Sequence, residues 1–201
     1  MTSGNKASQN FNLSDVVGQT ASSLFSSKGY LIQSGFLNSS AGTVFSLSIY
    51  PTVVDFGALT PNSPVEKTLQ ITVSNGEVPG YNISVVEDHE LSTSAQATIA
   101  DTSCNQTNQP CTVNKAVRWD DGIYGFGYNL VGNTVTRDFT DKSYFRPFAN
   151  LSQKESPAQI MISQQRKVID QSVMTLKLNI SPDQAVGQYR NALNFTAVAG
   201  I

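Results

Sequence analysis

Charged side chains are scarce in this chain of 201 residues, and their scarcity excludes two classes of partner. Asp, Glu, Lys and Arg together make up 14% of the sequence, the net charge is −2, and the basic residues form no cluster. Because nucleic-acid binding depends on a concentrated positive surface, we expect no nucleic-acid partner. No apolar run approaches the roughly 18 residues that cross a bilayer, so we expect no transmembrane segment.

The signatures of hydrolytic catalysis are also missing. His89 is the only histidine, and it lies in the acidic segment 87–90, where a solvated side chain is the simplest interpretation. A serine hydrolase would need that ring between a nucleophile and an acid, and no Gly-x-Ser-x-Gly motif is present. A glycosidase would need two carboxylates across a cleft, whereas Asp120 and Asp121 stand in an apparent turn. We therefore expect no enzymatic activity.

Four acidic residues offer a weak alternative, which is a bound calcium ion. Calcium takes six to eight oxygen ligands and often stabilises extracellular loops. The candidates are Asp120, Asp121, Asp138 and Asp141, but their spacing matches no known ligand loop. We expect no other metal or cofactor, and solvated turns are the default interpretation of these residues.

The chain is rich in Ser, Thr and Asn, and period-two alternation of apolar and polar residues is its main pattern. Such alternation, bounded by Gly, Pro and Asn, is typical of half-buried strands. We expect strands over residues 45–49, 69–73, 81–85, 123–130, 174–180 and 189–197. The turn residues between 74 and 80 predict a tight antiparallel connection. The fold prediction is all-β, an antiparallel β-sandwich, Ig-like or jelly-roll-like, with an N-terminal strand extension.

Cysteine occurs only twice, at Cys104 and Cys111, within a turn-rich stretch. A disulfide there would close a small loop and indicate an oxidising compartment, so we expect an extracellular or cell-surface protein. Two reduced thiols without a role are the alternative. Two thiols without a second pair or a nearby His do not complete a zinc site.

Seven Asn-x-Ser/Thr sequons exceed the number expected by chance, which makes glycosylation a hypothesis. Asn82, Asn179 and Asn194 follow strand alternation and are expected to point outward, where a glycan would have to lie. The equally simple alternative is that outward strand positions are filled with Asn, Ser and Thr.

The N-terminal region contains a short repeat with a period of 19 residues, over 8–14 and 27–34. Each copy places an aromatic residue two positions before an aliphatic one, and a Ser-rich stretch connects the copies. We expect residues 1–37 to form a strand arm and residues 38–201 to form the β-sandwich domain.

The arm resembles a pattern common in secreted bacterial proteins, Ser-x-x-aromatic-x-Leu, then Gly-Gln, then Ser-x-x-Tyr-x-Leu/Ile-x-x-Gly-Phe. The matching residues are Ser8, Phe11, Leu13, Gly18, Gln19, Ser27, Tyr30, Ile32, Gly35 and Phe36. The segment 49–59, with Pro51-Thr-Val-Val-Asp-Phe-Gly57, resembles the opening of bacterial Ig-like surface domains. The segments 124–129 and 187–197 are similar to uncharacterised secreted β-domain proteins of small-genome bacteria. These resemblances imply export, a β-sandwich and a surface role, and they transfer no activity.

Aromatic residues gather between positions 119 and 148 and allow two interpretations. Several of them exposed together would form a sugar-stacking platform, but alternating aromatics are more often core or cross-strand pairs. The residues are Trp119, Tyr124, Phe126, Tyr128, Tyr144, Phe145 and Phe148.

The functional hypothesis is a non-catalytic structural subunit that assembles with other copies of itself into a filament, a pilus-like fibre or a surface layer. Phe11 and Leu13, with Val16 and Val17, form an apolar ribbon that would add as a donor strand to an open sheet edge of the next copy. The arm folding back onto its own domain is the competing arrangement. A carbohydrate-binding or adhesive module, with surface glycans as partners, is the alternative function.

Overall fold

The computed structural model describes residues 4–7, 12–15, 23–27, 30–34, 45–105, 109–166 and 169–200. The chain divides into two compact units, Met1–Gly42 and Thr43–Ile201. The sequence predicts this boundary after residue 37. The described regular structure is antiparallel β-sheet together with one short 3-10 helix, η2 (Leu151–Gln153). The all-β class and the antiparallel pairing that the sequence predicts are therefore confirmed.

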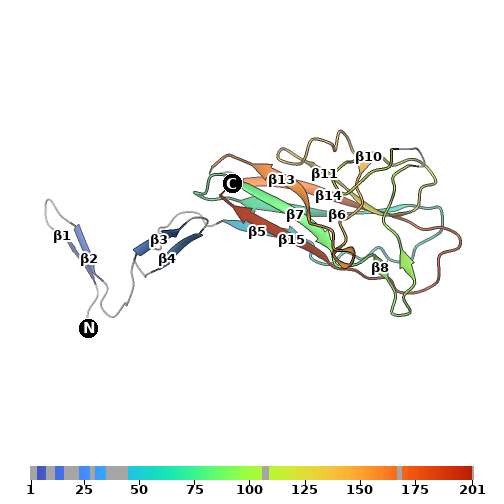
Figure 1. Cartoon of the computed structure of the whole chain (residues 1–201), viewed down its shortest axis with the longest axis horizontal. Helices are drawn as coiled ribbons and strands as arrows, with labels where there is room; N and C mark the ends of the chain where they lie inside the picture. Colours follow the sequence, from blue (N-terminus) through green and yellow to red (C-terminus); the bar gives the residue numbers. More distant parts are fainter. Residues whose placement is uncertain are drawn as a thin grey trace. The chain divides into compact units, whose positions relative to one another are not determined.

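The described residues of the first unit form two hairpins (Figure 1). Strand β1 (Gly4–Ala7) pairs with β2 (Asn12–Asp15), and β3 (Ser23–Ser27) pairs with β4 (Tyr30–Ser34). Strand β2 contains the C-terminal part of the first repeat copy, and β4 contains that of the second. Each copy thus contributes a strand, and each of those strands already has one neighbour.

The second unit contains two main antiparallel sheets, of four and three strands. The larger has the order β11 (Gly125–Gly132), β14 (Ile169–Asn179), β6 (Val65–Ser74), β5 (Ser46–Tyr50). The smaller has the order β13 (Ala158–Ser163), β7 (Tyr81–Glu87), β15 (Leu193–Ala199). Two further pairs are short: β8 (Leu91–Ser92) with β9 (Thr98–Ile99), and β10 (Val117–Arg118) with β12 (Tyr144–Phe145).

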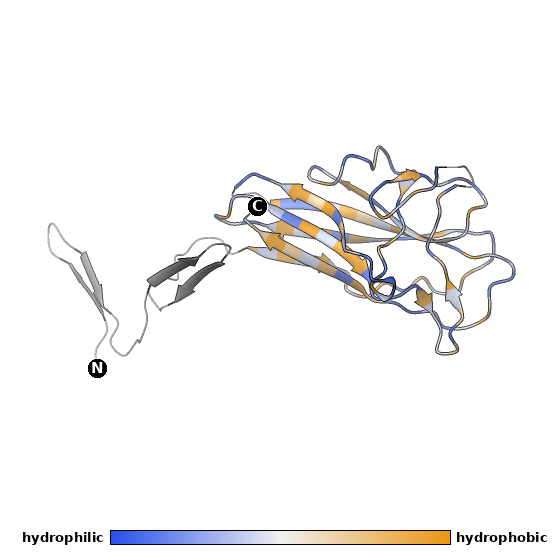
Figure 2. Ribbon diagram, in the orientation of Figure 1, coloured by the Kyte–Doolittle hydropathy of each residue, from blue (hydrophilic) through white to orange (hydrophobic). Residues whose placement is uncertain are grey.

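One hydrophobic core lies between the two main sheets. Buried residues of β6, β11 and β14 belong to the same cluster as buried residues of β7 and β13. Every second residue is buried from 69 to 73 in β6 and from 172 to 178 in β14, and Figure 2 shows apolar and polar positions in alternation there. The hydroxyl of Tyr81 on β7 donates to Asp170 on β14 at 2.7 Å, so polar contacts also join the layers. The prediction of an Ig-like or jelly-roll-like topology stays a prediction.

The connection between β6 and β7 differs from the predicted hairpin. The turn is present, but the two strands do not pair, because β6 joins the larger sheet and β7 the smaller. The odd-numbered residues 69–73 of β6 and 81–85 of β7 are buried, and these two rows of side chains belong to one core because the sheets face each other. Gly80 closes the turn with φ +87°, and an added Cβ would collide with the carbonyl oxygen of Ser163.

Candidate functional site

Other described segments of the chain cover the outer edges of β11 and β13, but not those of β5 and β15. The outer side of β11 is covered, because Phe126 exchanges backbone hydrogen bonds with Ala100 and Thr102, and Tyr128 exchanges two with Arg146 at 2.9 Å. This cover prevents another strand from pairing with β11, which is one of the ways proteins protect sheet edges.

The outer side of β13 is covered by the chain that leaves β11. Thr136 donates its backbone N–H to the carbonyl of Ile160, and Ile162 donates to that of Thr134, at 3.1 and 2.9 Å. The segment 134–136 therefore passes from the larger sheet to the rim of the smaller one. The outer edge of β13 is covered in this way.

The other two edges, β5 and β15, are open within the described part of the chain. No backbone hydrogen bond from a described residue reaches the outer side of either strand. On β15 the inward residues Leu193, Phe195 and Ala197 pack against the core but remain only half-buried. Unpaired backbone beside incompletely covered apolar side chains is the arrangement that accepts an additional strand.

The direction of each backbone group on β15 follows from its pairing with β7. Ala192 accepts from the N–H of Asp88, and Gly200 donates to Gly80, so both of these even-numbered residues face β7. The register between them is unbroken. Because alternate residues of an antiparallel strand bond to opposite sides, the N–H groups of the odd-numbered residues 193–199 point away from the domain.

The start of β15 is held by carboxylates. Asn191 donates its side-chain amide to Glu87 Oε2 at 2.8 Å, and the backbone N–H of Ala192 donates to Asp88 Oδ1 at 2.7 Å. Glu87 is fully buried at the end of β7. The entry of the chain into this open edge thus depends on two acidic side chains.

Glu87 also forms a buried acid pair with Asp101. Glu87 Oε1 and Asp101 Oδ1 are both buried and accept no hydrogen bond from another described residue. Each carboxyl group lies within reach of the other, and two carboxyl groups can share a hydrogen bond only when one of them carries a proton. Burial and, after it, the nearby charge of Glu87 raise the pKa of Asp101 to about 9. Burial also raises the pKa of Glu87, although hydrogen bonds from Asp101 and Asn191 oppose that effect. At neutral pH the pair therefore retains a proton.

The predicted donor residues lie mostly outside the described residues. This applies to Phe11, Val16 and Val17, whereas the backbone of Leu13 lies in β2 and pairs with Lys6. The donor role of these residues therefore stays a prediction.

The two cysteines stand at disulfide distance, with their Cα atoms 5.6 Å apart, and the bond between them closes the predicted loop. Cys104 and Cys111 join Trp119, Ile123 and Phe145 in a small second core. The disulfide thus packs the loop that precedes β10 against the side chains of Trp119, Ile123 and Phe145.

The three predicted glycosylation positions differ in accessibility. Asn194 is exposed on β15, as expected. Asn179 is only 4% exposed, and its Nδ2, the atom that would carry a glycan, donates to the carbonyl of Ile123 at 2.8 Å. The predicted outward orientation of Asn179 is therefore wrong, because the chain before β11 covers that end of the sheet. Asn82 is half-buried, and its Oδ1 is buried without a hydrogen-bond partner.

The four candidate calcium ligands do not form one site. Asp138 is occupied by Arg146, whose Nε donates to Oδ2 at 2.6 Å and whose Nη2 donates to Oδ1. Asp141 accepts from the backbone and hydroxyl of Ser143, while Asp120 and Asp121 are exposed. No metal-binding group of three acidic, His or Cys side chains occurs among the described residues.

The aromatic residues that suggested a sugar-binding platform are mainly core residues. Trp119, Phe126, Tyr128, Phe145 and Phe148 are buried, and several pack ring against ring, such as Tyr128 on Phe148 at 4.5 Å between centroids. Their burial contradicts an exposed platform. The binding-module alternative is left without the surface on which it depended.

His89 lies between possible partners but does not form a catalytic arrangement. Its Nε2 is 3.5 Å from Asp88 Oδ2, and its Nδ1 is 2.7 Å from the carbonyl of Glu90 and 3.3 Å from Ser92 Oγ. The short contact to a carbonyl requires a proton on Nδ1, so that nitrogen does not accept a proton from Ser92.

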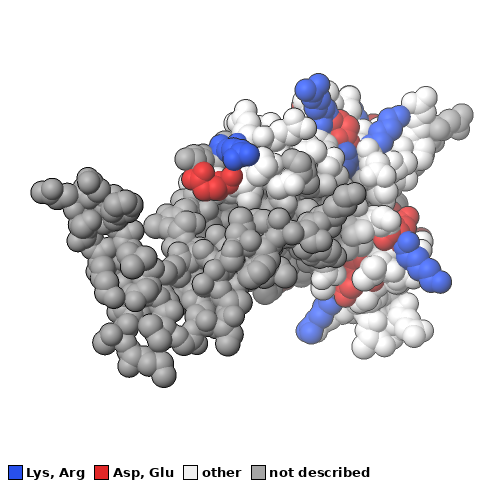
Figure 3. All heavy atoms as spheres, turned by 60° about the vertical axis from the view of Figure 1, so that its left-hand side comes forward, with Lys and Arg blue, Asp and Glu red and all other residues white. Residues whose placement is uncertain are grey.

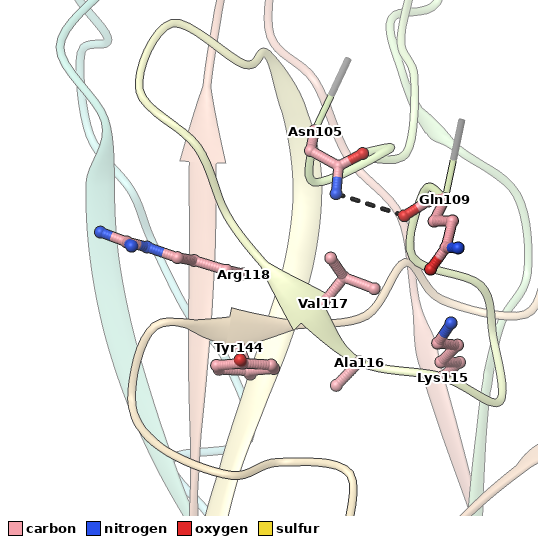
Figure 4. A pocket seen from close by; sticks show the side chains of 7 residues that line it. All are labelled: Asn105, Gln109, Lys115, Ala116, Val117, Arg118 and Tyr144. Carbon is pink, nitrogen blue, oxygen red and sulfur yellow. Dashed lines mark hydrogen bonds between the residues drawn. The ribbon is translucent and has the colours of Figure 1, made fainter. Parts of the chain in front are cut away.

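A shallow, open depression of about 500 Å³ lies beside β10 and β12 (Figure 4). Asn105 Nδ2 donates to the carbonyl of Gln109 across its rim at 3.2 Å. Arg118 and Lys115 extend in opposite directions, so the polar side chains do not converge on one point. On the face shown in Figure 3, acidic and basic side chains lie in small mixed groups, without an extended patch of one sign on its described part.

No protein-family model matches the chain, and neither the curated proteins nor the solved structures contain a significant match. Within the described ranges, no helix has the length and apolar character needed to cross a bilayer.

Proposed function

We propose that the chain is a non-catalytic structural subunit whose β15 edge accepts a strand from the N-terminal arm of another copy. The observation that carries this proposal is the contrast between the edges: β11 and β13 are covered by irregular segments, whereas β15 offers outward N–H groups beside half-buried Leu193 and Phe195. Of the two open edges β15 is the longer, with seven residues against five in β5.

The arm is a suitable donor because its strands have little support of their own. Each of its hairpins has only two strands, four or five residues long. A two-stranded hairpin is marginally stable in water, so adding it to an existing sheet gains hydrogen bonds and apolar contacts. Repetition of such a contact from copy to copy joins different surfaces and produces an open chain of subunits. The disulfide is in keeping with an extracellular or cell-surface location.

One substitution separates edge pairing from folding. Ala197 directs its N–H outward, so Ala197→Pro removes a donor from the open edge without removing a hydrogen bond to β7. Ala197→Val is the matched control, because it keeps the N–H and favours strand structure. Sedimentation velocity should show concentration-dependent assembly for the wild type and Ala197→Val, and mainly monomer for Ala197→Pro.

The same measurement can contradict the proposal. A full-length wild type that stays monomeric at high concentration would show that the arm does not join copies. Undiminished assembly of Ala197→Pro would show that copies associate through another surface.

A further inference from the structure

The buried acid pair lies next to the residues that fix the start of the open edge. Glu87 is the inner partner: it faces Asp101 on one side and accepts from Asn191 on the other. Its backbone N–H donates to the carbonyl of Ala149, which keeps it in place at the end of β7. A change at the pair is therefore transmitted directly to the segment before Leu193.

The charged groups that act on the pair are acidic, and the buried hydroxyl of Tyr128 on β11 also lies within electrostatic reach of Asp101. Asp88 and Glu90 follow β7, and Glu155 follows η2. The basic groups near the ends of β7 and β15 have other partners: His89 contacts Asp88, and Arg190 contacts Gln188. The buried Arg146, which acts on the same Tyr128 hydroxyl as Asp101, is paired with Asp138. Within the described residues, no ion pair reaches Glu87 or Asp101. Loss of the shared proton therefore leaves two unneutralised negative charges in a buried site.

We propose that the proton shared by Glu87 and Asp101 is a switch that holds the start of β15 in place and releases it when the proton is lost. The segment 191–193 is the element that moves, because its side-chain anchors are Glu87 itself and the neighbouring Asp88, whereas Arg190 before it is held by two backbone hydrogen bonds to Ser92. Ala192 is exposed, and β15 is an edge strand, whereas Asp101 adjoins backbone hydrogen bonds to Phe126 and β7 is central in its sheet. Acidic and neutral conditions keep the edge ordered, and alkaline conditions loosen it.

The switch rests on the contacts of Glu87, while its effect on assembly rests on the function proposed above. A loosened start of β15 presents a shorter edge to an incoming strand. Assembly through β15 should therefore weaken over the same pH range in which the pair loses its proton.

Hydrogen exchange of the full chain tests the switch at a dilution where copies do not associate. We expect the protection of the Ala192 and Asn194 amides, corrected for intrinsic exchange, to fall by roughly tenfold or more between about pH 6 and pH 10, the effect of at least one pKa unit. The amides of Ile71 and Val73 in the central strand β6 should not show this fall. In Asp101→Asn, which keeps a neutral hydrogen-bonding group, protection at Ala192 and Asn194 should not depend on pH.

Control variants keep the test decisive. Asp183→Asn removes the same charge at an exposed turn and should behave as the wild type. If Asp101→Asn does not fold, Glu87→Gln removes the proton-sharing pair from the other side and should give the same pH-independent protection. The switch would be overturned if amide protection at Ala192 and Asn194 did not fall with rising pH in the wild type. It would also be overturned if a folded Asp101→Asn variant showed the same fall as the wild type.

Failure of the switch and failure of the assembly function give different results. Exchange that follows the expected pattern while sedimentation shows monomer at every pH would support the switch and refute the assembly function. Assembly without pH-dependent exchange at Ala192 and Asn194 would refute the switch alone. Calcium chloride that restores protection at high pH in the wild type, but not in Asp101→Asn, would show that the pair takes a cation and would overturn the proton switch.

Discussion

The backbone of Arg146 covers the β11 edge, and the side chain of Arg146 is held in place by an ion pair with Asp138. Removing the negative charge of Asp138 should therefore uncover that edge. Arg146 is 3% exposed, and its backbone supplies both hydrogen bonds that cover Tyr128. Its guanidinium group is held mainly by Asp138 and lies 4.8 Å from the ring centroid of Phe139. The substitution Asp138→Asn keeps one acceptor oxygen for the N–H of Ala116, and removes the charge together with one of the two oxygens that accept from Arg146.

The expected loss of unfolding free energy follows from the burial of Arg146. Removing one partner of a buried ion pair typically costs about 3–5 kcal/mol, because the remaining charge is left uncompensated. The side chain of Asp138 is 24% exposed, and Arg146 keeps hydrogen bonds to Thr136 and to the carbonyl of Gln159. We therefore expect a loss near the lower limit, about 3 kcal/mol of unfolding free energy at pH 7.

The stability difference between the wild type and Asp138→Asn should also become smaller as the pH falls. Burial alone would raise the pKa of Asp138, but hydrogen bonds from Arg146 and Ala116 outweigh it and lower that pKa below its usual range. A lowered pKa in the folded state stabilises the fold above the ordinary aspartate pKa of about 4 and loses that effect as the pH falls through the lower value. The difference between wild type and Asp138→Asn should therefore shrink below about pH 3.

Urea denaturation of the wild type and Asp138→Asn, followed by circular dichroism, measures this loss. Asp141→Asn is the matched control, because the carboxylate of Asp141 is exposed on the same loop and accepts from Ser143. The denaturation midpoint of Asp141→Asn should stay close to that of the wild type. A loss below about 1 kcal/mol for Asp138→Asn, the range of exposed pairs, would refute the account of a buried pair holding the β11 cover.

Three further predictions concern the loop, the turn and the sequons. Replacing Cys104 and Cys111 by Ser should lower the unfolding free energy by about 2–3 kcal/mol, the chain-entropy value for a short loop, as measured by urea denaturation; no change would mean that the bond does not constrain the unfolded chain. Gly80→Ala should cost about 2 kcal/mol or more, because φ is +87° and the new Cβ would meet Ser163, and an unchanged melting temperature would contradict this geometry. In a glycosylating host, mass spectrometry should find glycan on exposed Asn194 and none on the buried sequon residues, and a glycan on those residues would contradict their burial.

Alternation predicted the strands but not their places in the sheets. The half-buried strand at 174–180 was clear from its sequence, because one face had to be apolar. Period two says nothing about which sheet a strand joins, so the turn at 74–80 was found while the pairing of its two strands was wrong. Strand β13 was missed, because Ala158-Gln-Ile-Met-Ile-Ser alternates poorly and contains a register shift.

The candidate site was only partly visible in the sequence. Glu87 could have been found, because it continues the inward positions of Tyr81, Ile83 and Val85 and so places a carboxyl group in the core. Its partner Asp101 is 14 residues away across a loop, and nothing local indicates the pairing. The covers over β11 and β13 consist of isolated bridges from irregular segments, which form only when the tertiary structure brings those segments to the edges.

The most direct test of the central claim is hydrogen exchange on β15 as a function of protein concentration at neutral pH. If β15 accepts a strand from another copy, the outward amides of Leu193, Phe195 and Ala197 gain protection as the protein assembles, while the amides of buried β6 stay unchanged. Assembly that leaves these three amides exchanging as fast as in the dilute protein would contradict the claim.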